Sequence, residues 1–338
     1  MSKITTIGLD LAKNVFHAVC CDRRGKQVSR KMLRRNQVLP YFIQKEACLV
    51  GMEGCASAHY WAREIQKLGH QVKLIPPQYV KPFVRGNKND YNDALAIAEA
   101  VTRPEMRFAT IKTQAQQDIQ ALHRLRERRV QERTALCNQV RGLLAEYGIA
   151  IAKGVRSLQH KLPVLLEDGE NGLSDVFRQY LAQIQQQLHE LDAHIGFYTN
   201  ILLEQSRQNE TCQRLQTIPG FGPIVASVFY SIVGNGEVYQ RGRDVSAALG
   251  LVPKQHSSGG KNRLLGISKR GDRYMRTLLV HGARSVVMRA TNKDDKLSRW
   301  INRIKEERGF NKAVVALANK MARIGWAVIA HKTRYQTA

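Results

Sequence analysis

The chain has 338 residues, of which 43% are hydrophobic, so it can form two or three domains with real cores and is not an intrinsically disordered protein. Lys and Arg number 53 against 28 Asp and Glu, which gives a formal net charge of +25. Such a charge attracts polyanions and predicts a nucleic-acid partner. The six cysteines form no C-x-x-C pair, which argues against a disulfide scaffold and a zinc ribbon. With no signal peptide at its start and no apolar run beyond about 11 residues, we expect a cytoplasmic, nucleoid-associated protein without a membrane partner.

Residues 1–105 have the pattern of an α/β domain. Short runs rich in β-branched residues, separated by turn residues, predict strands at 4–9, 15–21, 27–33, 47–52 and 71–75. Helical patterns predict helices at 38–45, 57–68 and 90–102. A three-stranded meander followed by alternating helices and strands predicts a ribonuclease H-like fold.

Residues 106–214 show helical patterns alone. Two long helices are predicted at 114–147 and 174–205. The second carries apolar residues at alternating spacings of four and three, the seam of a coiled coil: Phe177, Leu181, Ile184, Leu188, Leu191, Ile195, Tyr198 and Leu202. Either a second subunit or another helix of the same chain could cover this stripe.

Residues 215–338 are predicted to form a mainly helical, basic domain. Positions 241–338 hold 22 Lys and Arg against 6 Asp and Glu, so we expect the densest polyanion contact here. The run 218–223 resembles a helix-hairpin-helix turn, where Gly220 and Gly222 could present backbone N–H groups to a phosphate, although a plain tight turn has the same residues. The glycine-rich run 256–262 is predicted to be a flexible loop, and its flanks supply the candidate nucleic-acid contacts Lys254, Lys261, Arg263, Lys269 and Arg270.

Four carboxylates of the first domain fall at points that the predicted fold brings together. Asp10 and Glu53 end the first and fourth strands, which are neighbours in a ribonuclease H-like sheet. Asp90 and Asp93 open the last helix of the domain on one face. Converging carboxylates require cations, and oxygen-only ligands predict a pair of Mg²⁺ or Mn²⁺ ions. The alternative is that Asp90 caps the helix and that Asp93 interacts favourably with the helix dipole in the first turn. The other two would then be ordinary strand-end acids.

Several motifs in this order resemble the DEDD-type insertion-sequence transposases, the family of insertion sequence one-ten and its eleven-eleven subgroup. The matching runs are Gly8-Leu9-Asp10, Met52-Glu53-Gly54, Asp90-x-x-Asp93-Ala94, Ile218-Pro219-Gly220-Phe221-Gly222 and Leu249-Gly250-Leu251-Val252-Pro253 through Ser258-Gly259. The resemblance implies three parts: a RuvC-like domain (1–105), a coiled-coil domain (106–214) and a C-terminal transposase domain (215–338). It also implies that Asp10, Glu53, Asp90 and Asp93 bind Mg²⁺.

The same resemblance implies an unusual reaction. Ser258 would be the nucleophile, forming a phosphoserine with DNA, and a non-coding bridge RNA would select the donor and target DNA by base pairing. Carboxylates of one subunit would meet the serine of another, which requires a homo-oligomer, a dimer or tetramer. Because the run Ser257-Ser258-Gly259-Gly260 departs from the family's acid-Ser-Gly-Ser pattern, Ser257 is a second candidate. A RuvC-like junction resolvase that uses metal-activated water is the alternative function, and a nucleic-acid packaging protein is the third.

Overall fold

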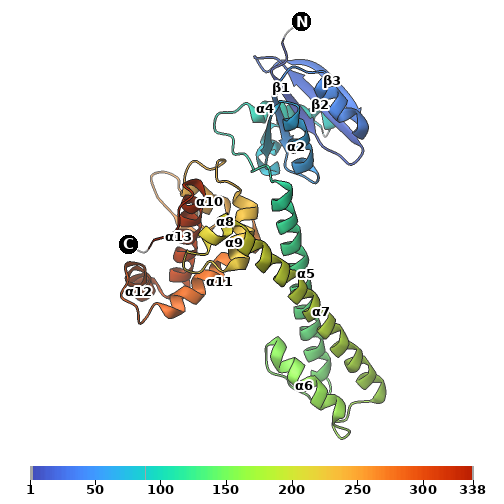
Figure 1. The fold of residues 1–338 in the computed structure, drawn as a ribbon, viewed down its shortest axis with the longest axis vertical. Coiled ribbons are helices and arrows are strands. Elements are labelled where there is room, and N and C mark those ends of the chain that lie inside the picture. Colours follow the sequence, from blue (N-terminus) through green and yellow to red (C-terminus); the bar gives the residue numbers. More distant parts are fainter. Residues whose placement is uncertain (1–2, 88, 337–338) are drawn as a thin grey trace. The chain divides into compact units, whose positions relative to one another are not determined.

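The computed structural model describes residues 3–87 and 89–336, and its packing divides the chain into two compact units (Figure 1). The first unit comprises Met1–Gln116 with Ile232–Gln240, and the second comprises Gln117–Ser231 with Arg241–Ala338. The helices predicted at 114–147 and 174–205 therefore share a unit with the C-terminal segment. The division into three domains remains a prediction.

A five-stranded mixed sheet forms the centre of the first unit. Its strands are β1 (Thr6–Asp10), β2 (Val15–Cys21), β3 (Gln27–Arg34), β4 (Leu49–Glu53) and β5 (Gln71–Ile75), in the order β3-β2-β1-β4-β5. The first three pair antiparallel, whereas β4 and β5 run parallel to β1. This is the predicted meander with its parallel extension, so the ribonuclease H-like architecture is confirmed.

Helices cover both faces of this sheet. A large apolar core joins one face to α1 (Val38–Ile43) and α2 (Ala58–Lys67), while α4 (Asp90–Val101) packs on the other face. Short connecting segments are η1 (Arg35–Gln37), α3 (Pro77–Val80) and η2 (Lys81–Phe83). Proline at the first position of α3 fits a helix start, because its missing N–H would be unpaired there.

Two glycines allow α4 to lie directly against the sheet. A Cβ added to Gly8 would come 2.0 Å from the Ala94 carbonyl oxygen, and one added to Gly51 would come 2.9 Å from Val101 Cβ. Neither position leaves space for even a methyl group. The glycine of the Gly8-Leu9-Asp10 run is thus required by helix–sheet packing.

Three helices form an elongated part of the second unit: α5 (Gln114–Ala145, which begins in the first unit), α6 (Val155–Glu167) and α7 (Asp175–Gln208) (Figure 1). Four of the eight residues in the apolar stripe of α7 are buried within the chain: Leu181, Leu188, Ile195 and Leu202. Leu181 and Leu188 pack with residues of α5 and α6. The alternative of an internal partner helix is therefore supported for this part of the stripe. A coiled coil with a second subunit remains a prediction.

The C-terminal part of the second unit consists of α8 (Glu210–Leu215), α9 (Pro223–Val233), α10 (Gly242–Ala248), α11 (Arg273–Arg289), α12 (Lys296–Arg308) and α13 (Phe310–Ala330). The domain is mainly helical, as predicted, and β6 (Pro253–Gln255) and β7 (Leu264–Ile267) add an antiparallel hairpin that was not predicted. The hairpin escapes a pattern search because its strands are short and exposed, without apolar alternation.

A buried histidine links the two parts of the second unit. His123 on α5 is 1% exposed, with Nε2 lying 3.0 Å from the Ser227 hydroxyl oxygen and Nδ1 3.1 Å from that of Tyr274. Burial and the nearby charge of Arg126 lower the pKa of His123 to about 4. The imidazole is therefore neutral inside the fold at physiological pH.

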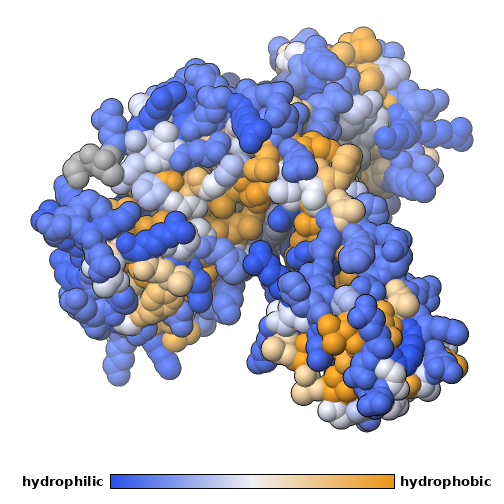
Figure 2. Space-filling view, turned by 60° about the horizontal axis from the view of Figure 1, so that its bottom comes forward, coloured by the Kyte–Doolittle hydropathy of each residue, from blue (hydrophilic) through white to orange (hydrophobic). Residues whose placement is uncertain are grey.

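One helix of the described residues, α13, is long and apolar enough to span a membrane by length and composition. Half of that stretch is buried within the fold, and Lys312, Lys320 and Arg323 lie along it. These features are typical of a core helix. Figure 2 shows hydrophilic residues over most of one face of the molecule, with apolar residues gathered in separate patches.

Candidate active site

Asp10 and Glu53 end neighbouring parallel strands at the same edge of the sheet. Leu9 pairs with Met52 in the β1–β4 ladder, so the two carboxylates occupy the next position on each strand. Side chains alternate across a strand, which puts Asp10 on the face of Gly8 and Glu53 on the face of Gly51. Both acids therefore lie on the face that α4 covers.

Helix α4 brings the other two carboxylates to this edge. Asp90 is its first residue and Asp93 lies one turn on, while Ala94 packs against Gly8 two residues before Asp10. The cap of α4 is Asn89, whose Oδ1 accepts a hydrogen bond of 2.9 Å from the Tyr91 N–H. The alternative that Asp90 serves as the N-cap is therefore not needed, and its carboxylate is left for the site.

Electrostatics show that the four acids converge. Burial raises the pKa of Asp10 to about 6, with further contributions from the negative charges of Asp93, Asp90 and Glu53. Burial and the charge of Asp93 also raise the pKa of Glu53. The neighbouring negative charges make Asp10 and Glu53 harder to ionise, and a bound cation would relieve this repulsion.

A histidine that was not predicted from the sequence lies at the edge of this cluster. His17 lies directly opposite Asp10 in the β1–β2 ladder, and its Nδ1 is 3.5 Å from Asp90 Oδ2. The His17 ring also meets the Tyr91 ring edge to face, with centroids 4.8 Å apart. Counting back through the hairpin from Asp10 would have placed His17 on the same face.

The donor set fits Mg²⁺ or Mn²⁺ in chemistry, because all four predicted ligands offer carboxylate oxygens. Among the residues that the structure describes, no three or more His, Cys, Asp or Glu side chains are already spaced to hold a metal ion. The carboxylates would have to close around a cation. Metal binding by the four acids is therefore a proposal.

An exposed thiol lies beside the cluster. Of the six free cysteines, Cys55 is exposed and the other five are buried. It follows Glu53 by two residues, and the charges of Glu53 and Asp10 act on its thiol. The cluster thus lies next to a surface that solvent can reach.

Ser258 lies at the tip of the β6–β7 hairpin. It bridges to Lys261, whose N–H donates to the Ser258 carbonyl oxygen over 3.0 Å. Gly259 and Gly260 between them have φ of +55° and +76°, the left-handed pair that a two-residue type I′ turn requires. The predicted flexible loop is thus a tight turn that exposes Ser258.

The two serines of this hairpin differ in their hydrogen bonds. Ser257 Oγ accepts from Gln255 Nε2 at 3.0 Å and from the Arg263 N–H at 3.4 Å. Ser258 Oγ makes no such bond within the described parts of the chain, and the residue is exposed. Ser257 therefore serves the hairpin, while the Ser258 hydroxyl is available for reaction.

The predicted nucleic-acid contacts fall into two groups. Lys254, Lys261, Arg263, Lys269 and Arg270 are all exposed on or beside the hairpin that carries Ser258. Gly220 instead packs tightly, because a Cβ there would come 2.9 Å from the Gly282 carbonyl oxygen. Its φ of +89° and this close approach explain the glycine, while Gly222 is exposed at the start of α9.

The fold and the carboxylate cluster together define a ribonuclease H-like enzyme domain of the DEDD type. Residues 7–149 match the family model of DEDD transposases of the IS110 type, and residues 212–299 match that of the Transposase IS116/IS110/IS902 family. The chain belongs to this family of insertion-sequence transposases, enzymes that cleave and rejoin DNA.

Curated relatives match the chain from end to end. A probable family 20 transposase of Pseudomonas aeruginosa is 46% identical over 98% of this chain and 99% of its own length. The transposase for insertion sequence element IS1111A of Coxiella burnetii is 44% identical over 99% of this chain and 92% of its own. The transposase for insertion sequence element IS1328 of Yersinia enterocolitica is 42% identical over 98% of this chain and 99% of its own length.

Proposed function

We propose that this transposase exchanges DNA strands through a phosphoserine formed by Ser258, with Asp10, Glu53, Asp90 and Asp93 binding Mg²⁺ or Mn²⁺, at DNA sites that a guide RNA selects. The observation that carries the proposal is the free, exposed hydroxyl of Ser258 on a basic hairpin of a chain that also gathers four acids at a sheet edge.

The proposed reaction conserves bond energy. As the bond from Ser258 Oγ to the DNA phosphorus forms, a bridging P–O bond breaks and the departing deoxyribose oxygen takes up the serine proton. A deoxyribose hydroxyl of a second strand then attacks the phosphoserine, which releases Ser258 and restores its proton. The number of phosphodiester bonds is unchanged, so no nucleotide cofactor is needed.

The carboxylate cluster would serve this reaction by holding divalent cations, which neutralise charge on the reacting phosphate. Burial, together with the charges of Asp93, Asp90 and Glu53, raises the pKa of Asp10 to about 6, and the repulsion among these acids supports a cation at this position. His17 would orient Asp90 from the neighbouring strand, given its distance of 3.5 Å. Gly8 would keep Asp93 close to Asp10 by allowing α4 to approach the sheet.

Guidance by a non-coding RNA is proposed from charge. A surface with a net charge of +25 binds phosphate backbones without reading their sequence, and a paired guide would supply the sequence choice. Binding of the RNA should therefore weaken steeply as salt rises, and joined DNA products should require it. Products formed equally well without RNA would contradict this part of the proposal.

We also propose that the active enzyme is a homo-oligomer in which the acids of one subunit serve Ser258 of another. Mixing an Asp10→Ala protein with a Ser258→Ala protein tests this directly. Recovery of strand exchange in the mixture, with neither protein active alone, is the expected result. A mixture as inactive as its parts would mean that each subunit uses its own acids.

The central experiment traps the covalent intermediate. Wild-type protein, DNA and candidate guide RNA are quenched with denaturant, and protein-linked DNA is separated by denaturing electrophoresis before and after protease. We expect a heat-stable adduct that protease removes. Ser258→Ala should lose both the adduct and the joined products while still binding nucleic acid through the flanking cations. Ser257→Ala is the matched control and should keep both.

The same experiment separates the alternative function. A junction resolvase that uses water would release free ends, form no adduct and tolerate Ser258→Ala. Clean cleavage by that variant would replace the phosphoserine proposal with the resolvase. No other observation favours the resolvase over the recombinase.

A further inference from the structure

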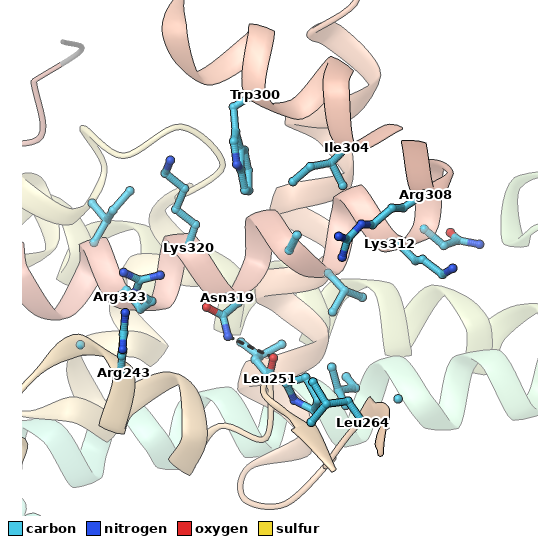
Figure 3. Close-up of a pocket in the computed structure, with 18 of the residues that line it drawn as sticks. Arg243, Leu251, Leu264, Trp300, Ile304, Arg308, Lys312, Asn319, Lys320 and Arg323 are labelled. Atoms are coloured by element: carbon cyan, nitrogen blue, oxygen red, sulfur yellow. Dashed lines mark hydrogen bonds between the residues drawn. The ribbon is translucent and has the colours of Figure 1, made fainter. Parts of the chain in front are cut away.

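A large groove opens on the C-terminal part of the second unit, away from the carboxylate cluster in sequence. Its volume is about 1540 Å³, and its walls come from α10, α12, α13 and the β6–β7 hairpin (Figure 3). We call it the basic groove. Its wall on the hairpin side includes Pro253 and residues 264–267, the two strands that carry Ser258 at their tip.

Most of the cations around this groove have no carboxylate partner. Six cations line it: Arg241, Arg243, Arg308, Lys312, Lys320 and Arg323. Arg241 pairs with Asp244, whereas the other five have no carboxylate within salt-bridge distance among the residues that the structure describes. Within the described part of the chain, no Asp or Glu lines the groove. Burial and the charges of Arg323 and Lys296 lower the pKa of Lys320, as expected for a cation crowded by others. The groove is therefore strongly positive and suited to a polyanion.

The floor of the groove is apolar and aromatic. Leu264 and Leu265 of β7 are 65% and 42% exposed, large fractions for leucine, and Ile304 and Val315 contribute further apolar surface. Trp300 lies between the two groups of cations in Figure 3, with Arg243 and Arg323 at one end and Arg308 and Lys312 at the other. Lys320 Nζ lies 4.5 Å from the centroid of the Trp300 ring.

We propose that the basic groove binds an unpaired strand of nucleic acid, with bases against Trp300 and the leucines of β7 and phosphates against the cationic rim. A duplex presents phosphates outward and keeps its base faces stacked inside, so it could satisfy the rim but would leave the apolar floor uncovered. An unpaired strand offers both surfaces, because every base has a face that stacks on aromatic and apolar side chains.

The location makes the groove useful to the proposed reaction. DNA joined to Ser258 at the hairpin tip would continue along the strands that wall the groove. This inference rests on the proposed function only for the source of its ligand. A guide that pairs with one DNA strand displaces the other, and loops of the RNA are a second source of unpaired strand.

Tryptophan fluorescence reports occupancy of the groove directly. The chain has three tryptophans, of which Trp300 and Trp326 line the groove and Trp61 is 3% exposed in the core of the first unit. We expect oligothymidylate of about 20 nucleotides to quench the emission of the full-length protein, with salt reversing the effect. In a Trp326→Phe background the quenching should persist, and Trp300→Phe should remove most of it.

Matched variants locate the contact. Arg308→Glu with Lys312→Glu should weaken binding of the unpaired strand by about 10-fold or more, and Trp300→Ala by about 5- to 100-fold. Arg289→Glu with Lys293→Glu makes the same change of charge outside the groove and should have a much smaller effect. Thermal unfolding of each variant checks that the fold is retained, and the milder Trp300→Phe covers a failure of Trp300→Ala to fold.

Oligouridylate and oligothymidylate distinguish an RNA source from a DNA source, and preference for either is consistent with the groove. A duplex that quenches and competes as well as the single strand would overturn the inference. The inference would also be overturned if quenching were absent and the Leu264→Asp variant had a lower mass than wild type in light scattering. That pair of results would make the groove a subunit interface. Loss of the Ser258 adduct with intact quenching would refute the phosphoserine alone, whereas an adduct without quenching would refute the groove alone.

Discussion

The sheet edge that holds Asp10 and Glu53 and the hairpin that holds Ser258 differ in how firmly the chain around them fixes their positions. The acids extend from buried strands and lie under a helix whose backbone touches the sheet at Gly8. Ser258 lies on short exposed strands, held by a turn and a few hydrogen bonds. Buried elements thus hold the acids in place, whereas Ser258, the proposed nucleophile, lies on an exposed turn.

Neutralising the acids at the sheet edge is expected to have the largest effect on DNA cleavage. If the acids bind cations as proposed, Asp10→Asn and Asp93→Asn should each lower DNA cleavage by about 1000-fold or more, because each variant removes one carboxylate ligand while the shape of the side chain is kept. Glu46→Gln, an exposed acid of the same domain, is the control and should remain active. Near-normal cleavage by both site variants, measured on labelled DNA, would remove the acids from the reaction.

The packing that holds the acids in place can be tested at its glycine. Gly8→Ala should destabilise the protein by about 3–5 kcal/mol or prevent folding, because the new methyl group would overlap the Ala94 carbonyl oxygen. Gly266→Ala on β7 has nothing within 4 Å of the added carbon and should change stability by less than about 1 kcal/mol. Urea unfolding of the two variants makes the comparison, and equal effects would contradict it.

Helices α5, α6 and α7 form a third region, whose residues are held less firmly than the acids and more firmly than Ser258. Leu188 is 1% exposed among residues of α5 and α6, so Leu188→Ala should cost about 2–5 kcal/mol of stability. Tyr180 on the same helix is 58% exposed, and Tyr180→Ala should cost little. If a second subunit covers the rest of the stripe, light scattering of Leu191→Lys should show a lower mass. A change of mass in Leu188→Ala with unchanged unfolding would argue that the stripe faces a partner.

Acid should weaken the second unit through His123. Its pKa of about 4 in the fold lies below the ordinary value of 6.5, so the unfolded chain binds the extra proton. The contribution of neutral, buried His123 to the free energy of unfolding is fully present above pH 6.5. It is lost as the pH falls from about 6.5 to about 4, and the loss is at most about 3 kcal/mol. His123→Gln should flatten this part of the stability profile. An unchanged slope in pH-dependent unfolding would mean that other groups dominate.

The smallest effect is expected at Ser257. Its hydroxyl accepts two hydrogen bonds within the hairpin, so Ser257→Ala should loosen the turn by about 1 kcal/mol and slow strand exchange only a few-fold. Time courses of joined product for Ser257→Ala and wild type provide the measurement. A loss as large as that of Ser258→Ala would mean that Ser257 is the reacting serine.

Much of the carboxylate site could be predicted because the carboxyl ends of parallel strands meet at one edge. Asp10 and Glu53 follow buried strands whose adjacency is a property of the predicted fold, and Asp90 and Asp93 open the helix that closes over them. His17 could be placed beside the acids only by counting through the β1–β2 hairpin, whose register pairs it with Asp10. The spacing of the acids around a cation is likewise beyond sequence, because it depends on fractions of a side-chain length.

Elements without strong periodicity were harder to predict. Helix α6 was missed because Pro163 lies inside it, and proline ordinarily argues against a helix interior. The partner of the α7 stripe was visible only as Cys137, Val140 and Leu144 on α5, a shorter stripe in a charged sequence. The basic groove combines cations from three helices with apolar residues of the β6–β7 hairpin, so no local pattern marks it.

The exposure of Cys55 has a practical consequence. Since the other five cysteines are buried, a maleimide dye should attach to the native protein at this one position, two residues from Glu53. No cysteine would have to be removed or introduced first. A donor fluorophore there and an acceptor on the DNA would let single-molecule microscopy follow when the strand approaches the acids and when it departs.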